Sequence, residues 1–128
     1  RLPTYWADGL LVATSSGSTA YSLSVGGPIV MPQARVLIIS PIAPHNLNVR
    51  PIIVPDSSEI TLSVQSRDPS AVLTMDNRRV ELSPGTAISV KVAQFSLKRV
   101  RLEKSDFIHA LTGKLFWGED MRNGSESQ

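Results

Sequence analysis

The residues best suited to chemistry are gathered in one short stretch that is rich in hydroxyl groups. It contains Thr14, Ser15, Ser16, Ser18, Thr19, Tyr21, Ser22 and Ser24, with Gly17 inside it and Gly26-Gly27 after it. Glycines and small residues let backbone N–H groups converge on a ligand, and short hydroxyl groups lose little side-chain entropy when they bind one. The stretch predicts a loop that binds a polar, flat or phosphorylated ligand. A Ser/Thr-rich turn without a ligand is the alternative.

Several other kinds of site are excluded. No lysine follows a glycine pair at the spacing of a phosphate-binding P-loop, and the G-x-S-x-G pattern of a nucleophile elbow does not occur. The absence of cysteine excludes disulfides, thiolate metal sites and a cysteine nucleophile. No apolar run approaches the ~18 residues that span a membrane, and the first residues form no signal peptide. We expect a cytoplasmic protein with no membrane segment.

The charge of the chain is small but unevenly distributed. Its 13 Lys and Arg against 11 Asp and Glu give +2, too little to indicate a nucleic-acid partner. Most charges lie after residue 66. Because large exposed apolar patches are rare, we expect the charge-poor first half to pack against another surface. The chain has no initiator Met, and we expect it to be a piece of a longer protein.

The elements that must position the hydroxyl-rich stretch are mainly strands. Alternation predicts half-buried strands at 60–65 and 88–92, and continuous apolar runs predict strands covered on both faces at 10–13, 36–39 and 52–54. Two more strands, at 72–75 and 80–82, flank a predicted Asp76-Asn77 turn, and Ser83-Pro84-Gly85 makes the next turn. This spacing predicts an all-β, two-layer β-sandwich over residues 1–123.

Other features lie toward the end of the chain. Only residues 106–112 indicate a helix, with Ser105 as N-cap and Gly113 as its stop. The basic residues Lys98, Arg99, Arg101 and Lys104 alternate with apolar ones and predict a solvated strand face. Residues 124–128 are polar and are expected to form a disordered tail.

Two blocks of sequence and two shorter motifs follow one another along the chain. The first is Asp8-Gly9 followed by Thr14-x-x-Gly17-Ser18-Thr19-Ala20-Tyr21-Ser22-Leu23-Ser24-x-Gly26-Gly27-Pro28. The second, from Ser40 to Ile52, reads S-P-I-A-P-H-N-L-N-V-R-P-I. The shorter motifs are Val54-Pro55-Asp56-Ser57-Ser58 and Lys114-Leu115-Phe116-Trp117-Gly118. In this order the four segments resemble the ATP-dependent NAD kinases, and the resemblance extends over about residues 5–123.

The resemblance implies that this chain is the substrate-binding half of an NAD kinase. Such an enzyme phosphorylates the adenosine-ribose 2′-hydroxyl of NAD with ATP, giving NADP, and uses a divalent cation such as Mg²⁺ on the ATP phosphates. The family's α/β N-terminal domain carries a G-G-D-G-T motif and the catalytic Asp, and this sequence lacks that motif. We therefore expect no catalytic residue and no metal ligand in this chain, no activity of the chain alone, and a homo-oligomer, either dimer or tetramer.

The resemblance also implies which residues bind NAD. They are Asp8, Thr19, Ala20, Tyr21, Ser22, Leu23, Ser24 and Ala43, with Trp6, Ser16, His45 and Arg78 as weaker candidates. Trp6 stands where the family commonly has a basic residue, and its indole could stack on a base. Asp8 could instead be a turn aspartate, and Arg78 could meet a phosphate or project into water. His45 has no carboxylate at a defined spacing, so we expect it to organise its loop or contact ligand rather than act as a base. His109 is expected at a surface or interface.

Two other functions remain as alternatives. The first is a non-catalytic β-sandwich interaction module. The second is a relative of the lipid or diacylglycerol kinases, whose acceptor would favour a more apolar mouth than this hydroxyl-rich stretch offers.

Overall fold

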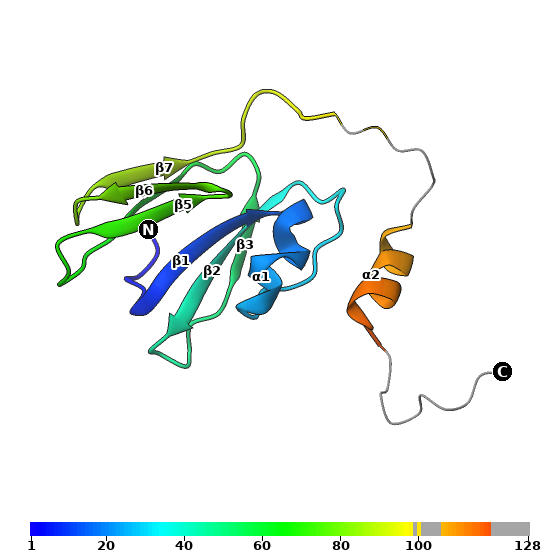
Figure 1. Ribbon diagram of the computed structural model, residues 1–128, viewed down its shortest axis with the longest axis horizontal. Helices are drawn as coiled ribbons and strands as arrows, with labels where there is room; N and C mark the ends of the chain where they lie inside the picture. The colour runs from blue at the N-terminus through cyan, green and yellow to red at the C-terminus, as the bar shows by residue number, and fades with distance from the viewer. Residues whose placement is uncertain (99, 101–105, 119–128) are drawn as a thin grey trace.

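The chain is built mainly from short antiparallel strands (Figure 1), and the computed structural model describes residues 1–98, 100 and 106–118. A three-stranded sheet has the order β1-β2-β3, formed by β1 (Ala7–Thr14), β2 (Val36–Pro44) and β3 (Ile52–Pro55). Two further pairs are β4 (Ile60–Ser63) with β7 (Ala87–Val90), and β5 (Ala71–Met75) with β6 (Arg78–Leu82). The helical elements are η1 (Ser15–Thr19), α1 (Tyr21–Ser24) and α2 (Phe107–Leu115).

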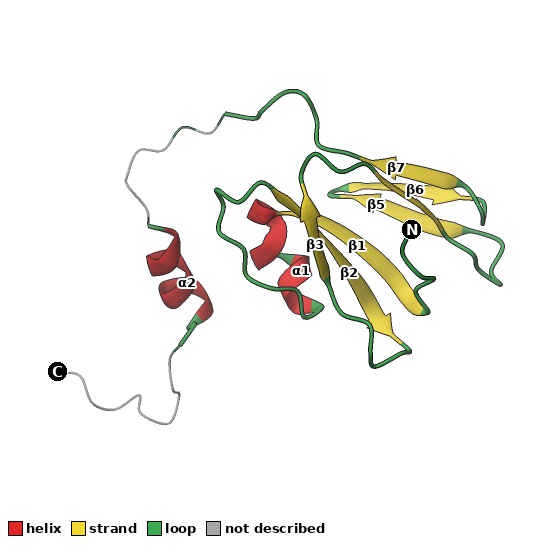
Figure 2. Cartoon of the chain, turned by 180° about the vertical axis from the view of Figure 1, so that it is seen from behind, coloured by secondary structure: helices red, strands yellow, loops and turns green. Residues whose placement is uncertain are grey.

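The core lies around the central strand β2. Leu37, Ile38 and Ile39 are at most 3% exposed, because β2 pairs with β1 on one edge and with β3 on the other. Val30 and Leu111 complete the buried apolar set among the described residues. In both overall views the three-stranded sheet lies between strands β5, β6 and β7 on one side and the helical elements on the other (Figure 2). The sheet is therefore the frame on which η1 and α1 rest.

The predicted strands are confirmed, and so is the all-β class, but burial on both faces was predicted for too many of them. Only β2 has a continuous run of buried residues. Strand β3 alternates between half-buried and exposed residues, with Ile53 47% exposed, and β1 is mostly half-buried. The reason is topology: β1 and β3 are the edges of their sheet, and each pairs with β2 alone.

Both predicted turns are present. Asp76-Asn77 joins β5 to β6, with Met75 paired to Arg78, and Asp76 adopts a φ of 49°. Gly85, in the turn between β6 and β7, has a φ of 84°, a conformation that glycine adopts without a side-chain clash. The β5–β6 hairpin therefore follows from local turn chemistry, whereas the Ser83-Pro84-Gly85 turn connects two strands that pair with different partners.

Elements η1 and α1 correct the prediction that residues 106–112 are the only helix. They lie in the stretch that was predicted to be a loop. Their turns are too short to show a helical period, and η1 begins on a side-chain cap instead: the Gly17 N–H donates to Thr14 Oγ1 at 3.3 Å. The hydroxyl-rich stretch is thus ordered by its own side chains.

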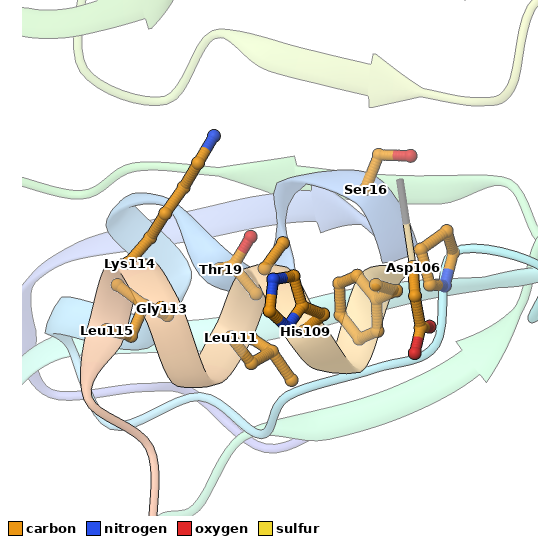
Figure 3. A pocket seen from close by; sticks show the side chains of 11 residues that line it. Ser16, Thr19, Asp106, His109, Leu111, Gly113, Lys114 and Leu115 are labelled. Carbon is orange, nitrogen blue, oxygen red and sulfur yellow. The ribbon is translucent and has the colours of Figure 1, made fainter. Parts of the chain in front are cut away.

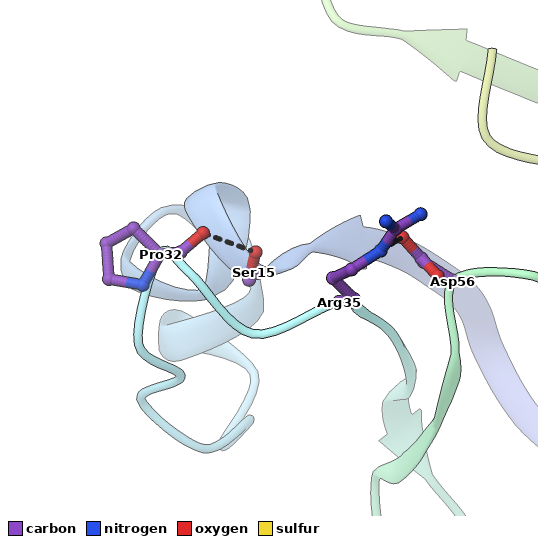
Figure 4. A network of polar contacts seen from close by, with 4 residues as sticks. All are labelled: Ser15, Pro32, Arg35 and Asp56. Atoms are coloured by element: carbon purple, nitrogen blue, oxygen red, sulfur yellow. Dashed lines mark hydrogen bonds and ion pairs between the residues drawn. The ribbon is translucent and has the colours of Figure 1, made fainter. Parts of the chain in front are cut away.

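Buried hydroxyl groups fasten η1 to the segment that leads into β2. Ser18 Oγ accepts from the Val30 N–H at 3.1 Å and donates to the Val30 carbonyl at 3.2 Å, and the Ser18 side chain is fully buried. Ser15 Oγ donates to the Pro32 carbonyl at 3.3 Å (Figure 4). Nearby, Arg35 Nε lies 3.0 Å from Asp56 Oδ2, which ties the start of β2 to the end of β3.

Helix α2 is confirmed, but its ends differ from the prediction. Its N-cap is Asp106, whose Oδ1 accepts from the Ile108 N–H at 3.2 Å, whereas Ser105 lies outside the described residues. The helix passes through Gly113 and ends at Phe116, which adopts the left-handed conformation with a φ of 53°. Gly113 is not the stop because Phe116 itself takes that conformation. No helix in the described part of the chain is long and apolar enough to cross a membrane.

The basic cluster and the tail are only partly covered by the described residues. Strand β7 ends at Val90, and Lys98 and Val100 belong to no strand, so the predicted strand face is wrong at those positions. Arg99, Arg101, Lys104 and residues 124–128 lie outside the described residues. Large exposed apolar side chains occur in both halves of the chain, and most of those described lie after residue 66, for example Phe95 and Trp117. The surface that needs covering is therefore not confined to the charge-poor half.

The Ser18 contact predicts a specific loss of stability. Ser18→Ala leaves the buried N–H and carbonyl of Val30 without their partner, which should lower the free energy of unfolding by about 1–3 kcal/mol. Chemical denaturation of the full-length protein measures this. Ser16→Ala is the matched control, because Ser16 is exposed and should change stability by less than about 0.5 kcal/mol. Equal effects of the two changes would contradict a structural role for the Ser18 hydroxyl.

Candidate functional site

The hydroxyl groups of the predicted binding stretch divide into two sets. Those of Thr14, Ser15 and Ser18 are used inside the protein, as cap and as tethers. Those of Ser16, Thr19, Tyr21 and Ser24 make no hydrogen bond to any other described residue, and each of these side chains is at least partly exposed. The second set is therefore free to bind a ligand, and its members follow one another along η1 and α1.

Two predicted residues, Tyr21 and Ser22, differ sharply although they are adjacent. The Tyr21 side chain is 57% exposed and can offer both its ring and its phenol. Ser22 is 1% exposed, and its Oγ has no hydrogen-bond partner among the described residues. Ser22 also faces Gly27, where an added Cβ would lie 2.4 Å from Ser22 Oγ. The Ser22 side chain packs inward, so its prediction as a ligand contact through that side chain receives no support from this geometry.

A pocket of about 680 Å³ separates η1 from α2. Ser16 and Thr19 line one side of it, and α2 supplies the other, from Asp106 through His109 to Lys114 (Figure 3). In the close view Thr19 lies toward the Lys114 end of the pocket, whereas Ser16 lies toward the Asp106 end. Sequence reasoning did not assign His109 or Lys114 to the site, because nothing local to α2 signals that it lies beside a segment some 90 residues earlier.

The remaining predicted residues form a second group at the other end of the β1–β2 pair. His45 Nε2 lies 3.3 Å from Asp8 Oδ1, and the backbone N–H of His45 donates to the Trp6 carbonyl at 2.8 Å. No carboxylate was expected beside His45 from sequence spacing, and the fold supplies one from a position 37 residues earlier in the chain. Asp8 belongs to strand β1 rather than to a turn. Both side chains are about two-thirds exposed, so the pair adds little stability and remains open to a ligand.

Backbone strain marks the same end of β2. Ala43 has a φ of 46°, a left-handed conformation that costs an L-residue about 1–2 kcal/mol. The ladder pairs Ala7 with Pro44 and Gly9 with Ile42 but not Asp8 with Ala43, so the strain lies where the pairing of β1 and β2 is interrupted, opposite Asp8. Such strain gathers at functional sites, where the surrounding structure must hold it in place.

The two groups of predicted residues begin at opposite ends of strand β1. From Asp8 to Thr14, β1 extends over about 20 Å at the strand rise of about 3.3 Å per residue, and η1 begins directly after Thr14. Arg78 belongs to neither group, because it is exposed at the start of β6 in a separate sheet. The structure therefore assembles Ser16 to Ser24 in one place and Trp6, Asp8, Ala43 and His45 in another.

Comparison with known proteins identifies the relatives of this arrangement. Residues 2–102 match the protein family described as the ATP-NAD kinase C-terminal domain. The chain belongs to this family. An NAD kinase of Flavobacterium psychrophilum is 43% identical over 122 residues, and one of Cytophaga hutchinsonii is 48% identical, each match covering 95% of this chain. The chain spans 42% of the length of these curated relatives.

Solved structures of NAD kinases share the fold. Yeast NADH kinase complexed with NADH superposes with a TM-score of 0.78 at 30% identity, covering 91% of this chain and 37% of that one. An NAD kinase from Archaeoglobus fulgidus in complex with ATP gives a TM-score of 0.62 at 31% identity, covering 70% and 34%. The resemblance seen in the sequence blocks and the β-domain fold are thus confirmed. These relatives favour the NAD kinase family over the interaction-module and lipid-kinase alternatives.

The strained Ala43 gives a prediction that separates backbone strain from side-chain packing. Ala43→Val adds a β-branched side chain at a positive φ and should lower the free energy of unfolding by about 1–2 kcal/mol, because such residues rarely adopt this conformation. Ala43→Gly should cost much less, since glycine adopts it freely. Denaturation of the full-length protein measures both changes. A larger loss for the glycine variant would contradict the strained conformation.

Proposed function

We propose that the protein containing this chain is an NAD kinase that transfers the γ-phosphoryl group of ATP to the adenosine-ribose 2′-hydroxyl of NAD. Within it, this chain binds and orients the acceptor. The observation that carries the proposal is the set of free hydroxyl groups on η1 and α1, in a chain whose curated relatives are named NAD kinase. Orientation matters because phosphoryl transfer depends mostly on positioning and electrostatic stabilisation.

The chemistry of the two groups suits the two halves of that task. The exposed Tyr21 ring can stack on a base, and the free hydroxyls of Thr19 and Ser24 can hydrogen-bond a ribose. The exposed carboxylate of Asp8 can accept two hydrogen bonds, from a ribose diol or from an amide. These side chains bind and orient, and none of them is assigned the removal of the acceptor proton.

ATP and a divalent cation complete the proposed reaction. The Archaeoglobus relative was solved with ATP, and Mg²⁺ would neutralise charge on the ATP phosphates. Among residues 1–98, 100 and 106–118 no three His, Asp or Glu side chains lie together in a way that could hold a metal ion. We propose that the cation ligands and the catalytic base belong to an N-terminal domain.

Substitutions at Tyr21 and Asp8 test the acceptor site. In the full-length enzyme Tyr21→Ala removes the stacking ring and should lower kcat/KM for NAD by about 10- to 100-fold, the range expected for one stacked base. Asp8→Ala should also remove most of the activity. Tyr21→Phe is the matched control, because it keeps the ring. Steady-state kinetics with NAD varied at saturating ATP measures these changes. Wild-type turnover in both alanine variants would contradict the assignment of Tyr21 and Asp8 to the acceptor site.

We further propose that the full-length enzyme is a homo-oligomer in which two copies share each NAD site. The support is geometric: Asp8 lies about 20 Å along β1 from the start of η1, so the two ends of the strand can face different copies of the chain. A second copy can bring its Asp8 end against the Tyr21 end of the first. Closed two-fold assembly would then repeat the same shared site twice.

Complementation between inactive variants tests this sharing. Co-expression of Tyr21→Ala and Asp8→Ala chains should restore activity, because about a quarter of the sites in randomly mixed two-fold dimers then combine an intact Tyr21 with an intact Asp8. Activity of the purified hetero-oligomer, identified by two affinity tags, is compared with that of each variant alone. If the mixture is no more active than the single variants, Asp8 and Tyr21 do not act across two copies.

A further inference from the structure

The pocket between η1 and α2 gathers hydrogen-bond donors that neither element supplies alone. Ser16 and Thr19 contribute hydroxyl groups from η1, and His109 and Lys114 contribute an imidazole and an ammonium from α2. Lys114 is exposed, and the ion pairs among the described residues, Arg35–Asp56 and Asp8–His45, leave it out. Its three N–H donors are therefore available to a ligand within the described surroundings.

The charge in the pocket is arranged along its length. Asp106 also lines it, but its carboxylate caps α2 through the Ile108 N–H, and Figure 3 shows it at the opposite end from the Lys114 ammonium. Leu111 is buried and, with Phe107, gives the pocket an apolar wall.

We propose that this pocket binds a phosphate group of the nucleotide substrate, with Lys114 as a phosphate-binding residue and Thr19 as its hydroxyl partner. An anion fits at the Lys114 end of the pocket, on the side where Thr19 also lies and away from the Asp106 carboxylate. This proposal rests on the proposed kinase function for the identity of the nucleotide. The free Thr19 hydroxyl joins this pocket to the binding stretch on η1 and α1, so one bound nucleotide can occupy both.

Lys114→Met in the full-length enzyme is the direct test. It should raise the KM for NAD or for ATP by about ten-fold, the effect of losing one charge-assisted hydrogen bond, and leave kcat nearly unchanged. Lys114→Arg should recover most of the loss because it restores the positive charge. Lys91→Met is the matched control, since Lys91 is exposed after β7 and does not line the pocket.

The substrate whose KM rises identifies the phosphate. A rise for NAD alone assigns the pocket to the NAD pyrophosphate, and a rise for ATP alone assigns it to the ATP phosphates; both outcomes support the proposal. An unchanged KM for both substrates would overturn it. A fall in melting temperature with no recovery by Lys114→Arg would overturn it too, because it assigns Lys114 to stability.

Binding of inorganic pyrophosphate, measured by calorimetry on the same full-length variants, separates this inference from the proposed function. If the wild-type protein binds pyrophosphate and Lys114→Met binds it about ten-fold more weakly, the pocket is supported even where NAD is not phosphorylated. If NAD is phosphorylated but Lys114→Met changes neither pyrophosphate binding nor the KM for NAD or ATP, the proposed kinase function is supported and the phosphate pocket is rejected.

Discussion

The candidate site depends on one buried contact, the double hydrogen bond between Ser18 Oγ and the backbone of Val30. It satisfies a donor and an acceptor in the chain that leads back to β2, and it does so inside the core. A hydroxyl is the smallest side-chain group that can both donate and accept, so it can close this contact without opening a cavity. Because Ser18 points inward, its neighbours Ser16 and Thr19 on the short 3-10 turn lie toward the surface and the pocket. The contact that stabilises the segment thus also sets the direction of its binding groups.

The hydroxyl groups of residues 14–24 have two different roles, and the structure shows which residues have which role. Thr14, Ser15 and Ser18 replace backbone partners that a regular helix or strand would supply, whereas Ser16, Thr19 and Ser24 keep their hydrogen-bonding capacity. The first set makes the second useful, because a ligand that meets pre-ordered groups loses less conformational entropy on binding. Substitutions in the two sets should therefore separate into effects on stability and effects on substrate binding.

The sequence predicted the strands well because their signals are local. Alternation at 60–65 and the Asp76-Asn77 turn need only neighbouring residues, and both appear in the structure. Contacts between distant positions could not be read in this way: the Asp8–His45 pair and the approach of α2 to Thr19 depend on how the chain folds back. The resemblance to a family supplied candidate residues without their directions, which is why buried Ser22 stood beside exposed Tyr21 among them. Helix α2 was found by its pattern, yet its end at Phe116 depends on one backbone conformation that the pattern does not encode.

The same geometry argues that neither group of polar residues is a complete site. The η1–α1 group has donors, an aromatic ring and an open pocket, and the Asp8–His45 group has an exposed carboxylate about 20 Å along β1 from the start of η1. Exposed apolar side chains such as Trp6 flank these groups, and water alone solvates them poorly. A surface that covers the apolar side chains would also exclude water from bound substrate, which strengthens the hydrogen bonds that orient it. We therefore infer that the event that completes the site, docking of a domain or of a second copy, also stabilises the surface around it, so that stability and catalytic competence are gained in one step.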